Sequence, residues 1–243
     1  TASNDNVVAH NRVLDSMVGV KMSGAWNTLV DSNQILPEHH FDPWGGIVMW
    51  DGGGNNTVVN NIIRRSQPNR IVDGIEVVHG VNNLIEGNTI ENLEGITLSY
   101  SYNNIVVHNN LTNIIHEGPD FHSYRSSPNA IQLYHSSNNA IMNNQIRSVQ
   151  SDAILLWENS SNNTIQGNRI DSSANGISLL YSSDNNSITN NEVSHIVDWT
   201  VLIEESSENV VSLNNFMGNA IQSRDTGQNA WSLRGQGNYW SDY

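Results

Sequence analysis

Short segments in which apolar and polar residues alternate recur along the whole chain. One phrase, a small residue followed by Ile, any residue and an apolar residue, occurs at 74–77, 95–98 and 130–133, among other places. A second phrase, Asn-x-Ile-x-Gly-Asn-x-Ile, occurs at 83–90 and again at 163–170. Alternation with a period of two predicts half-buried strands. The segments are bounded by Asn, Gly and Ser, which favour tight turns.

The asparagine of the second phrase recurs at a nearly constant interval. It stands at Asn11, Asn33, Asn61, Asn88, Asn109, Asn144, Asn168, Asn191 and Asn214, with spacings of 22, 28, 27, 21, 35, 24, 23 and 23 residues. This period is too short for a propeller blade of about 40 residues, and it leaves no helix for a βαβ unit. A single repeat cannot bury its own apolar face, but repeats stacked about 4.8 Å apart can. The pattern predicts an all-β fold over residues 1–243, a single right-handed parallel β-helix of about nine rungs.

The repeats resemble those of the NosD-like and CASH-domain parallel β-helix proteins, the latter named for carbohydrate binding and sugar hydrolysis. The resemblance covers about residues 4–242, and the closing segment Gly237–Tyr243 is similar to one that often ends such domains in archaeal surface proteins. It implies the fold and a range of functions: polysaccharide lyase, hydrolase, epimerase, periplasmic copper-site maturation or a non-catalytic surface role. The Asp-Pro-His-Asp motif of alginate epimerases is not found, which argues against that activity.

The composition limits the kinds of molecule that the protein can bind. Ten basic residues stand against 24 acidic ones, for a formal charge of −14, and there is no cysteine. A surface of this sign repels nucleic acid and anionic lipid, and a disulfide or thiolate metal site is excluded. No apolar run approaches the roughly 20 residues of a membrane span. The chain starts inside a rung and ends at the closing segment, so we expect part of a longer protein that is secreted or at the cell surface.

A column of ionisable and phenolic side chains follows from aligning the strands on their repeated Ile. Counting that Ile as the first residue, the fifth position of successive strands holds Asp51, His79, Tyr100, His135, Glu158, Tyr181 and Glu205. We expect His135 to contact both Tyr100 and Glu158, and Asp51 to contact His79. A carboxylate beside an imidazole suits general acid–base chemistry, and aromatic rings suit stacking on sugars. The alternative is that polar residues in a turn column are merely solvated.

Three segments interrupt the repeat and contain further candidate catalytic and binding residues. They cover residues 37–44, 64–70 and 116–125, and the last contains Asp120, His122, Tyr124 and Arg125. Insertions in a solenoid usually lie over its binding face. The segments belong to the same rungs as the polar column, which favours a site there. The alternative is that long loops simply tolerate polar residues.

We therefore expect an extracellular or cell-surface protein that binds polysaccharide along one face. Hydrolysis would use two carboxylates, with Glu158 as the first choice and Asp120, Glu76 or Asp51 as the other. Lyase chemistry would use His135 or His122 with Tyr100 or Tyr124, and Arg125 or calcium to neutralise a uronate. A non-catalytic module that binds glycan or protein is the third hypothesis.

The expected substrate-binding residues are Trp50, Asp51, His79, Tyr124, Arg125, Gln132, Tyr134, Trp157 and Tyr181. No residue is assigned to a metal, and no cofactor is required. Calcium remains an open candidate because carboxylates and Asn oxygens are abundant. His39 and His40 are adjacent and would point apart in an extended segment, which argues against a shared transition metal.

Overall fold

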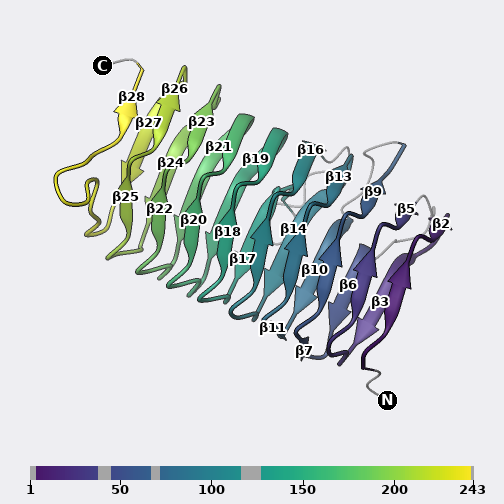
Figure 1. The fold of residues 1–243 in the computed structure, drawn as a ribbon. Coiled ribbons are helices and arrows are strands. Elements are labelled where there is room, and N and C mark those ends of the chain that lie inside the picture. Colours follow the sequence, from purple (N-terminus) through teal and green to yellow (C-terminus); the bar gives the residue numbers. More distant parts are fainter. Residues whose placement is uncertain (1–3, 38–44, 67–71, 116–126, 242–243) are drawn as a thin grey trace.

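A computed structural model describes residues 4–37, 45–66, 72–115 and 127–241. The chain winds as a right-handed parallel β-helix whose rungs follow one another from the N-terminal to the C-terminal end (Figure 1). Every paired strand in the described residues runs parallel to its neighbours on the rungs before and after it. The described part of the chain holds no helical segment with the length and apolarity of a membrane span.

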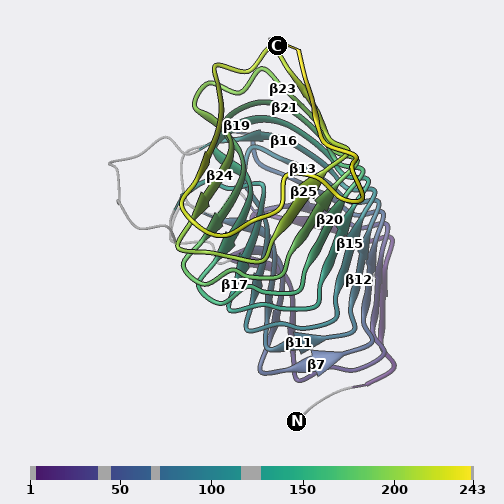
Figure 2. The ribbon, with the colours of Figure 1, turned by 90° about the vertical axis from the view of Figure 1, so that its left-hand side faces the viewer.

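One face of the solenoid is a sheet of nine short strands, one for each rung. Figure 2 shows β12, β15 and β20 of this sheet on one side of the stack, across from β17 and β24. Its members are β1 (Val7–Ala9), β4 (Leu29–Asp31), β8 (Thr57–Val59), β12 (Leu84–Glu86), β15 (Ile105–Val107), β18 (Ala140–Met142), β20 (Thr164–Gln166), β22 (Ser187–Thr189) and β25 (Val210–Ser212).

The remaining faces form a 17-stranded sheet in two series. The first series contains β2 (Arg12–Leu14), β5 (Gln34–Leu36), β9 (Ile62–Arg64), β13 (Thr89–Glu91), β16 (Asn110–Ile114), β23 (Glu192–Ser194), β26 (Asn215–Met217) and β28 (Tyr239–Trp240). The second contains β3 (Val18–Ser23), β6 (Gly45–Trp50), β10 (Asp73–Val78), β14 (Glu94–Ser99), β17 (Ile131–Tyr134), β24 (Trp199–Glu204) and β27 (Ile221–Asp225). The long strands β19 (Gln145–Trp157) and β21 (Arg169–Leu180) run through both series. A small two-stranded sheet joins β7 (Gly53–Gly54) to β11 (Gly80–Val81).

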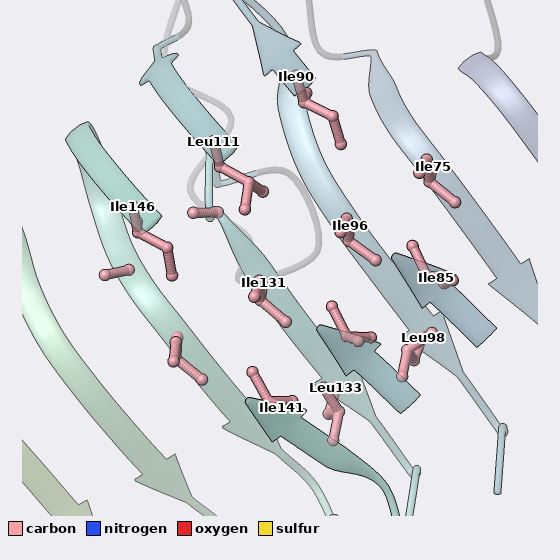
Figure 3. Close-up of a cluster of buried hydrophobic side chains, with 14 of the residues drawn as sticks. Ile75, Ile85, Ile90, Ile96, Leu98, Leu111, Ile131, Leu133, Ile141 and Ile146 are labelled. Carbon is pink, nitrogen blue, oxygen red and sulfur yellow. The ribbon is translucent and has the colours of Figure 1, made fainter. Parts of the chain in front are cut away.

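The repeated Ile residues build the core. Ile75 of β10 pairs with Ile96 of β14, which pairs with Ile131 of β17, and each is at most 1% exposed. Figure 3 shows these side chains one behind the next, with Leu98 and Leu133 in a second row. Burying each such side chain contributes about 1.5–3 kcal/mol. Stacking therefore lets each rung bury the apolar face that it could not bury alone.

Buried asparagines form a second kind of ladder. The Nδ2 of Asn61 donates to the Oδ1 of Asn88 at 3.0 Å, and the Nδ2 of Asn88 donates to the Oδ1 of Asn109 at 3.0 Å. Each also donates to a backbone carbonyl of the preceding rung. The asparagines that mark the sequence period are thus structural, because they satisfy backbone groups that the turns would leave unpaired.

The turn after the second series of strands repeats the same backbone conformation. Asp51, His79, Tyr100, His135 and Glu158 all have φ between 45° and 62°. This left-handed region is unusual for residues other than glycine. The chain therefore turns at the same point of successive rungs. The side chains that the sequence aligned in one column lie next to one another along the solenoid.

Candidate functional site

A hollow of about 280 Å³ opens on the outer face where β10, β14 and β17 lie side by side. Strand alternation turns one set of side chains into the core and leaves the other set to line the hollow. The described residues that line the hollow are Asp73, Glu76, Val78, Thr97, Ser99, Tyr100, Gln132 and Tyr134. Asp73 has the strand parity of the core residues Ile75 and Val77, so alternation alone does not place it there. Glu94, which is 7% exposed and is not among the described residues that line the hollow, pairs with Asp73 in the strand register.

Three carboxyl groups therefore gather on two neighbouring strands. The Thr97 hydroxyl donates to Asp73 Oδ1 at 2.6 Å, and the Trp50 indole Nε1 donates to Glu76 Oε2 at 2.7 Å. Among the residues that the structure describes, Glu94 Oε1 has no hydrogen-bond partner. The carboxyl groups of Asp73 and Glu76 are thus each oriented by a hydrogen bond from a side chain, whereas Glu94 Oε1 is not.

Burial perturbs the acidity of all three groups. It raises the pKa of Asp73 to about 7, with repulsion from Glu76 adding to the shift. Burial also raises the pKa of Glu76, although the hydrogen bond from Trp50 favours its charged form. The pKa of Glu94 lies well above its usual range, first because of burial and then because of Asp73 and Glu76. Carboxyl groups perturbed in this way are typical of functional sites.

Aromatic rings border the hollow and continue beyond it. Tyr100 lies edge-on to Tyr134 with centroids 5.2 Å apart, and Tyr134 contacts the Trp157 ring at 4.9 Å. Tyr134 and Gln132 are buried, at 7% and 6% exposure, so they form the floor and not an exposed platform. Trp157 is half-buried. Tyr134, which the sequence analysis assigns to substrate binding, is thus largely covered by the rings on the neighbouring rungs.

The turn column forms a stack of rings beside the hollow. His79 lies against Tyr100 with centroids 5.3 Å apart, and Tyr100 lies against His135 at 5.0 Å. His135 Nε2 approaches Glu158 Oε2 at 3.2 Å. These are the contacts that the sequence predicted for His135. Tyr181, on the rung after Glu158, continues the column and is 36% exposed.

Two other pairs of residues that the sequence analysis brought together are not neighbours in the described structure. Asp51 accepts a hydrogen bond from Ser23 Oγ at 2.5 Å, on the preceding rung, and forms no ion pair with His79, the described residue that it was expected to contact. The glycine pair after Asp51 has φ of 70° and 151°, which turns the chain differently from the turn at His79. Glu76 and Glu158 are three strands apart, about 14 Å at the backbone, which is too far for one pair of hydrolytic carboxylates.

Some candidates cannot be placed, and two acidic residues were missed. Asp120, His122, Tyr124 and Arg125 lie outside the described residues. Asp73 and Glu94 were not among the sequence candidates. The available signal was the residue just before the small residue of each repeat, where successive rungs carry Gly45, Asp73, Glu94, Asn129, Asp152 and Asn175. This column is polar on five consecutive rungs although it borders the core.

Comparison with known families agrees with this architecture. A family of periplasmic copper-binding proteins, NosD, matches residues 69–243, and the right-handed beta helix region matches residues 1–127. The chain belongs to the NosD family. A sequence search of curated proteins found no match.

Solved structures share the fold of this NosD-family chain at low identity. A tailspike protein mutant of E. coli bacteriophage HK620 in complex with pentasaccharide has a TM-score of 0.63 and 10% identity, over 88% of this chain and 42% of that one. The periplasmic alginate epimerase AlgG has a TM-score of 0.56 and 15% identity, over 87% of this chain and 61% of that one. The chain thus spans less than two thirds of the length of each. These likenesses show the fold alone.

The family name raises the question of copper, and the described residues do not fit such a centre. No group of three or more His, Asp or Glu in the described ranges is arranged to hold a metal ion, and the sequence has no cysteine. The His79 and His135 rings stack on opposite faces of Tyr100. They cannot share one ion, because the phenol ring stands between them.

Proposed function

We propose that this protein binds a polysaccharide along the outer face of β10, β14, β17 and β19 and hydrolyses it in the hollow. The main support for this proposal is that Asp73 and Glu76 line the same hollow and that burial raises the pKa of Asp73 to about 7. Asp73 then remains a proton donor near neutral pH. Glu76 accepts a hydrogen bond from Trp50 and Asp73 accepts one from Thr97, and repulsion from Glu76 adds to the rise in the pKa of Asp73, so Asp73 is the group that holds the proton. Unequal carboxyl groups of this kind are what glycoside hydrolysis requires.

The chemistry assigns one role to each group. Asp73 donates its proton to the glycosidic oxygen as the bond from that oxygen to the anomeric carbon breaks. Glu76 accepts a proton from the water that forms the new bond to the anomeric carbon. The stacked rings of His79, Tyr100 and His135 form a strip beside the hollow whose outward edges contact further sugar units. We place this activity outside the cell or at its surface, where polysaccharides are found.

The test is a polysaccharide panel incubated with the protein and assayed for new reducing ends. Asp73→Asn and Glu76→Gln should each lower the release of reducing ends by at least about a hundredfold. Glu208→Gln makes the same charge change at an exposed turn far along the solenoid and should retain full activity. Release that survives both site variants would show that hydrolysis does not use this pair. Binding without any release would favour the non-catalytic surface module.

A lyase is the second candidate, and the contact between His135 and Glu158 favours it. The carboxylate orients the imidazole, and the Tyr100 phenol lies next to it, so a base and an acid stand together. A uronate substrate would need neutralisation by Arg125 or calcium. Absorbance of an unsaturated uronate product that disappears in His135→Ala would establish this activity in place of hydrolysis.

A further inference from the structure

Gln132 is a buried amide on the floor of the hollow. It lies on β17 between the core residues Ile131 and Leu133, and strand alternation turns its side chain to the outer face, where it lines the hollow. The residue is only 6% exposed. Burying an amide is costly unless its donors and its acceptor find partners. The atoms that Gln132 already uses therefore define what it offers to a ligand.

The orientation of this amide is fixed from the main chain. The backbone N–H of Asp152 donates to Asn129 Oδ1 at 3.0 Å, and a backbone nitrogen can only donate. Asn129 must therefore present its Nδ2 on the other side, where it donates to Gln132 Oε1 at 2.9 Å. The oxygen of the Gln132 amide is thus already in use as an acceptor, and its Nε2 is turned away from Asn129.

The Nε2 atom of Gln132 is a donor that the hollow keeps for a ligand. No residue that the structure describes accepts a hydrogen bond from it. Gln132 is also the only amide among the described residues that line the hollow, where the other polar groups are carboxyls and hydroxyls. An amide nitrogen carries two N–H groups and accepts nothing. A ligand in the hollow must therefore bring an acceptor oxygen to this point.

We propose, on the basis of the function above, that Gln132 recognises the polysaccharide by donating from Nε2 to a neutral oxygen of a sugar unit, and that Asn129 positions it. Gln132 stands two strands from Glu76, with Thr97 between them, or about 10 Å at the backbone. It thus contacts the polysaccharide beside the bond that breaks and not at that bond.

The acceptor oxygen belongs to a neutral group. A carboxylate on the sugar would be repelled by the charged Glu76 in the same hollow, and the described residues that line the hollow include no Lys or Arg to offset this repulsion. A sugar hydroxyl and an N-acetyl carbonyl are both neutral acceptors that an amide N–H can reach. The substrate class is thus a polymer of neutral sugars.

Isothermal titration calorimetry with three tetramers tests this on the intact protein. Cellotetraose offers hydroxyls, the β-1,4-linked N-acetylglucosamine tetramer adds carbonyls, and the galacturonate tetramer adds carboxylates. We expect one of the two neutral tetramers to bind at least about tenfold more tightly than the galacturonate tetramer. Gln132→Met keeps the length of the side chain without the amide and should weaken that binding by about fivefold to tenfold. Gln145→Met makes the same change at an exposed residue of β19 and should bind normally.

Initial rates of reducing-end release on the same tetramer separate recognition from catalysis. Gln132→Met should raise KM by about the same factor and leave kcat nearly unchanged, because the contact is present before and during bond breaking. Asn129→Ala should also raise KM, since Gln132 is then no longer held with Nε2 toward the ligand. In the double variant, Asn129→Ala should add nothing to Gln132→Met. A merely structural role of Asn129 would instead weaken binding equally in both backgrounds.

The outcomes distinguish this inference from the proposed hydrolysis. If Gln132→Met weakens binding but no tetramer releases reducing ends, the recognition stands and the hydrolysis fails. If a neutral tetramer is cleaved with the same KM in Gln132→Met, the hydrolysis stands and the recognition by Gln132 fails. Tighter binding of the galacturonate tetramer overturns the neutral substrate class.

Two further results are also decisive. If no tetramer binds, the recognition fails, and the hydrolysis stands or fails with the polysaccharide panel. If Gln132→Met does not fold, Gln132→Glu replaces it, because this variant keeps the shape of the side chain and exchanges the donating nitrogen for an oxygen. Undiminished binding in that variant would overturn the proposal.

Discussion

Tyr100 and His135 lie face to face, with ring centroids 5.0 Å apart and planes 12° from parallel. They stand on consecutive rungs although 35 residues of sequence separate them, the longest spacing in the chain. The long insertion between them does not disturb the stack, because β14 and β17 pair from Ile96–Ile131 to Ser99–Tyr134 without a shift. The sequence between β16 and β17 can therefore be long while β14 and β17 keep their register.

Removal of the Tyr100 ring should weaken glycan binding and leave the fold intact. Tyr100 is 37% exposed and contacts His79, Tyr134 and His135 mainly through its ring. Loss of an aromatic contact of about 1–1.5 kcal/mol corresponds to roughly tenfold weaker binding. Titration calorimetry of Tyr100→Ala with the best ligand of the panel measures this. Tyr102→Ala, at a similarly exposed tyrosine two residues along the chain, should bind normally; equal weakening in both would rule out the stack as the platform.

The acidic cluster should make the protein less stable as the pH rises from about 4 to about 7. In this window the folded Asp73 retains a proton that the unfolded chain, with a pKa near 3.8, has already lost. The unfolding free energy then falls with rising pH, by about 1.4 kcal/mol for each unit by which the folded pKa is raised. Glu76 and Glu94 act in the same direction because their pKa values are also raised.

Thermal melts of the protein and of Asp73→Asn at pH 4.5 and pH 7.5 measure this effect. Between these two pH values the Asp73 contribution changes by roughly 3–3.5 kcal/mol, so the melting temperature of the unsubstituted protein should fall by roughly 6–14 °C more than that of the variant, at about 2–4 °C for each kcal/mol in a chain of this size. Asp171 provides an internal contrast. Its pKa is lowered by the hydrogen bond with His195, so its contribution is lost only as the pH falls below its usual range. Identical pH dependence in the two proteins would show that Asp73 ionises normally.

The regular part of this structure is predictable from the sequence because each repeat carries its own register. The Ile residues must face the core, and the asparagines must meet one another once the Ile residues are stacked. The contact of His135 with Tyr100 and Glu158 follows from the same register, four residues after each repeated Ile. Prediction from the sequence is reliable wherever a single repeat fixes the geometry.

The acidic cluster could not be derived in that way. Asp73 and Glu94 occupy a column where other rungs carry Gly45 and Asn129, so the column has no uniform chemistry to recognise. Burial raises the pKa values of Asp73 and Glu94, and the extent of burial depends on side chains from three rungs at once. The pairing of Glu76 with Glu158 failed for a related reason, since a shared face does not mean a shared rung.

Loss of one asparagine from the ladder should lower the free energy of unfolding measurably. Asn88 is fully buried and its side chain makes hydrogen bonds with Asn61, Asn109 and the carbonyl of Val58. Asn88→Ala leaves these groups unpaired and should cost about 2–4 kcal/mol. Denaturant unfolding compares it with Asn110→Ala, at an exposed asparagine in β16, which should change stability by less than about 0.5 kcal/mol. Equal effects at the two sites would mean that the ladder adds nothing beyond local turn preference.

The close approach of two rungs beneath the hollow should depend on Gly95. A Cβ added there would lie 1.7 Å from the carbonyl oxygen of Ala130, on the next rung. Gly95→Ala must push β14 away from β17, and overpacking of this kind costs about 1–3 kcal/mol, or a fall in melting temperature of roughly 2–12 °C. Gly237→Ala is the control, since its added Cβ would meet nothing nearer than 3.7 Å. Because Glu94 immediately precedes Gly95, the shift should also lower glycan release even at temperatures where the variant is fully folded. A folded Gly95→Ala protein with undiminished release would show that the spacing of β14 and β17 does not set the geometry of the hollow.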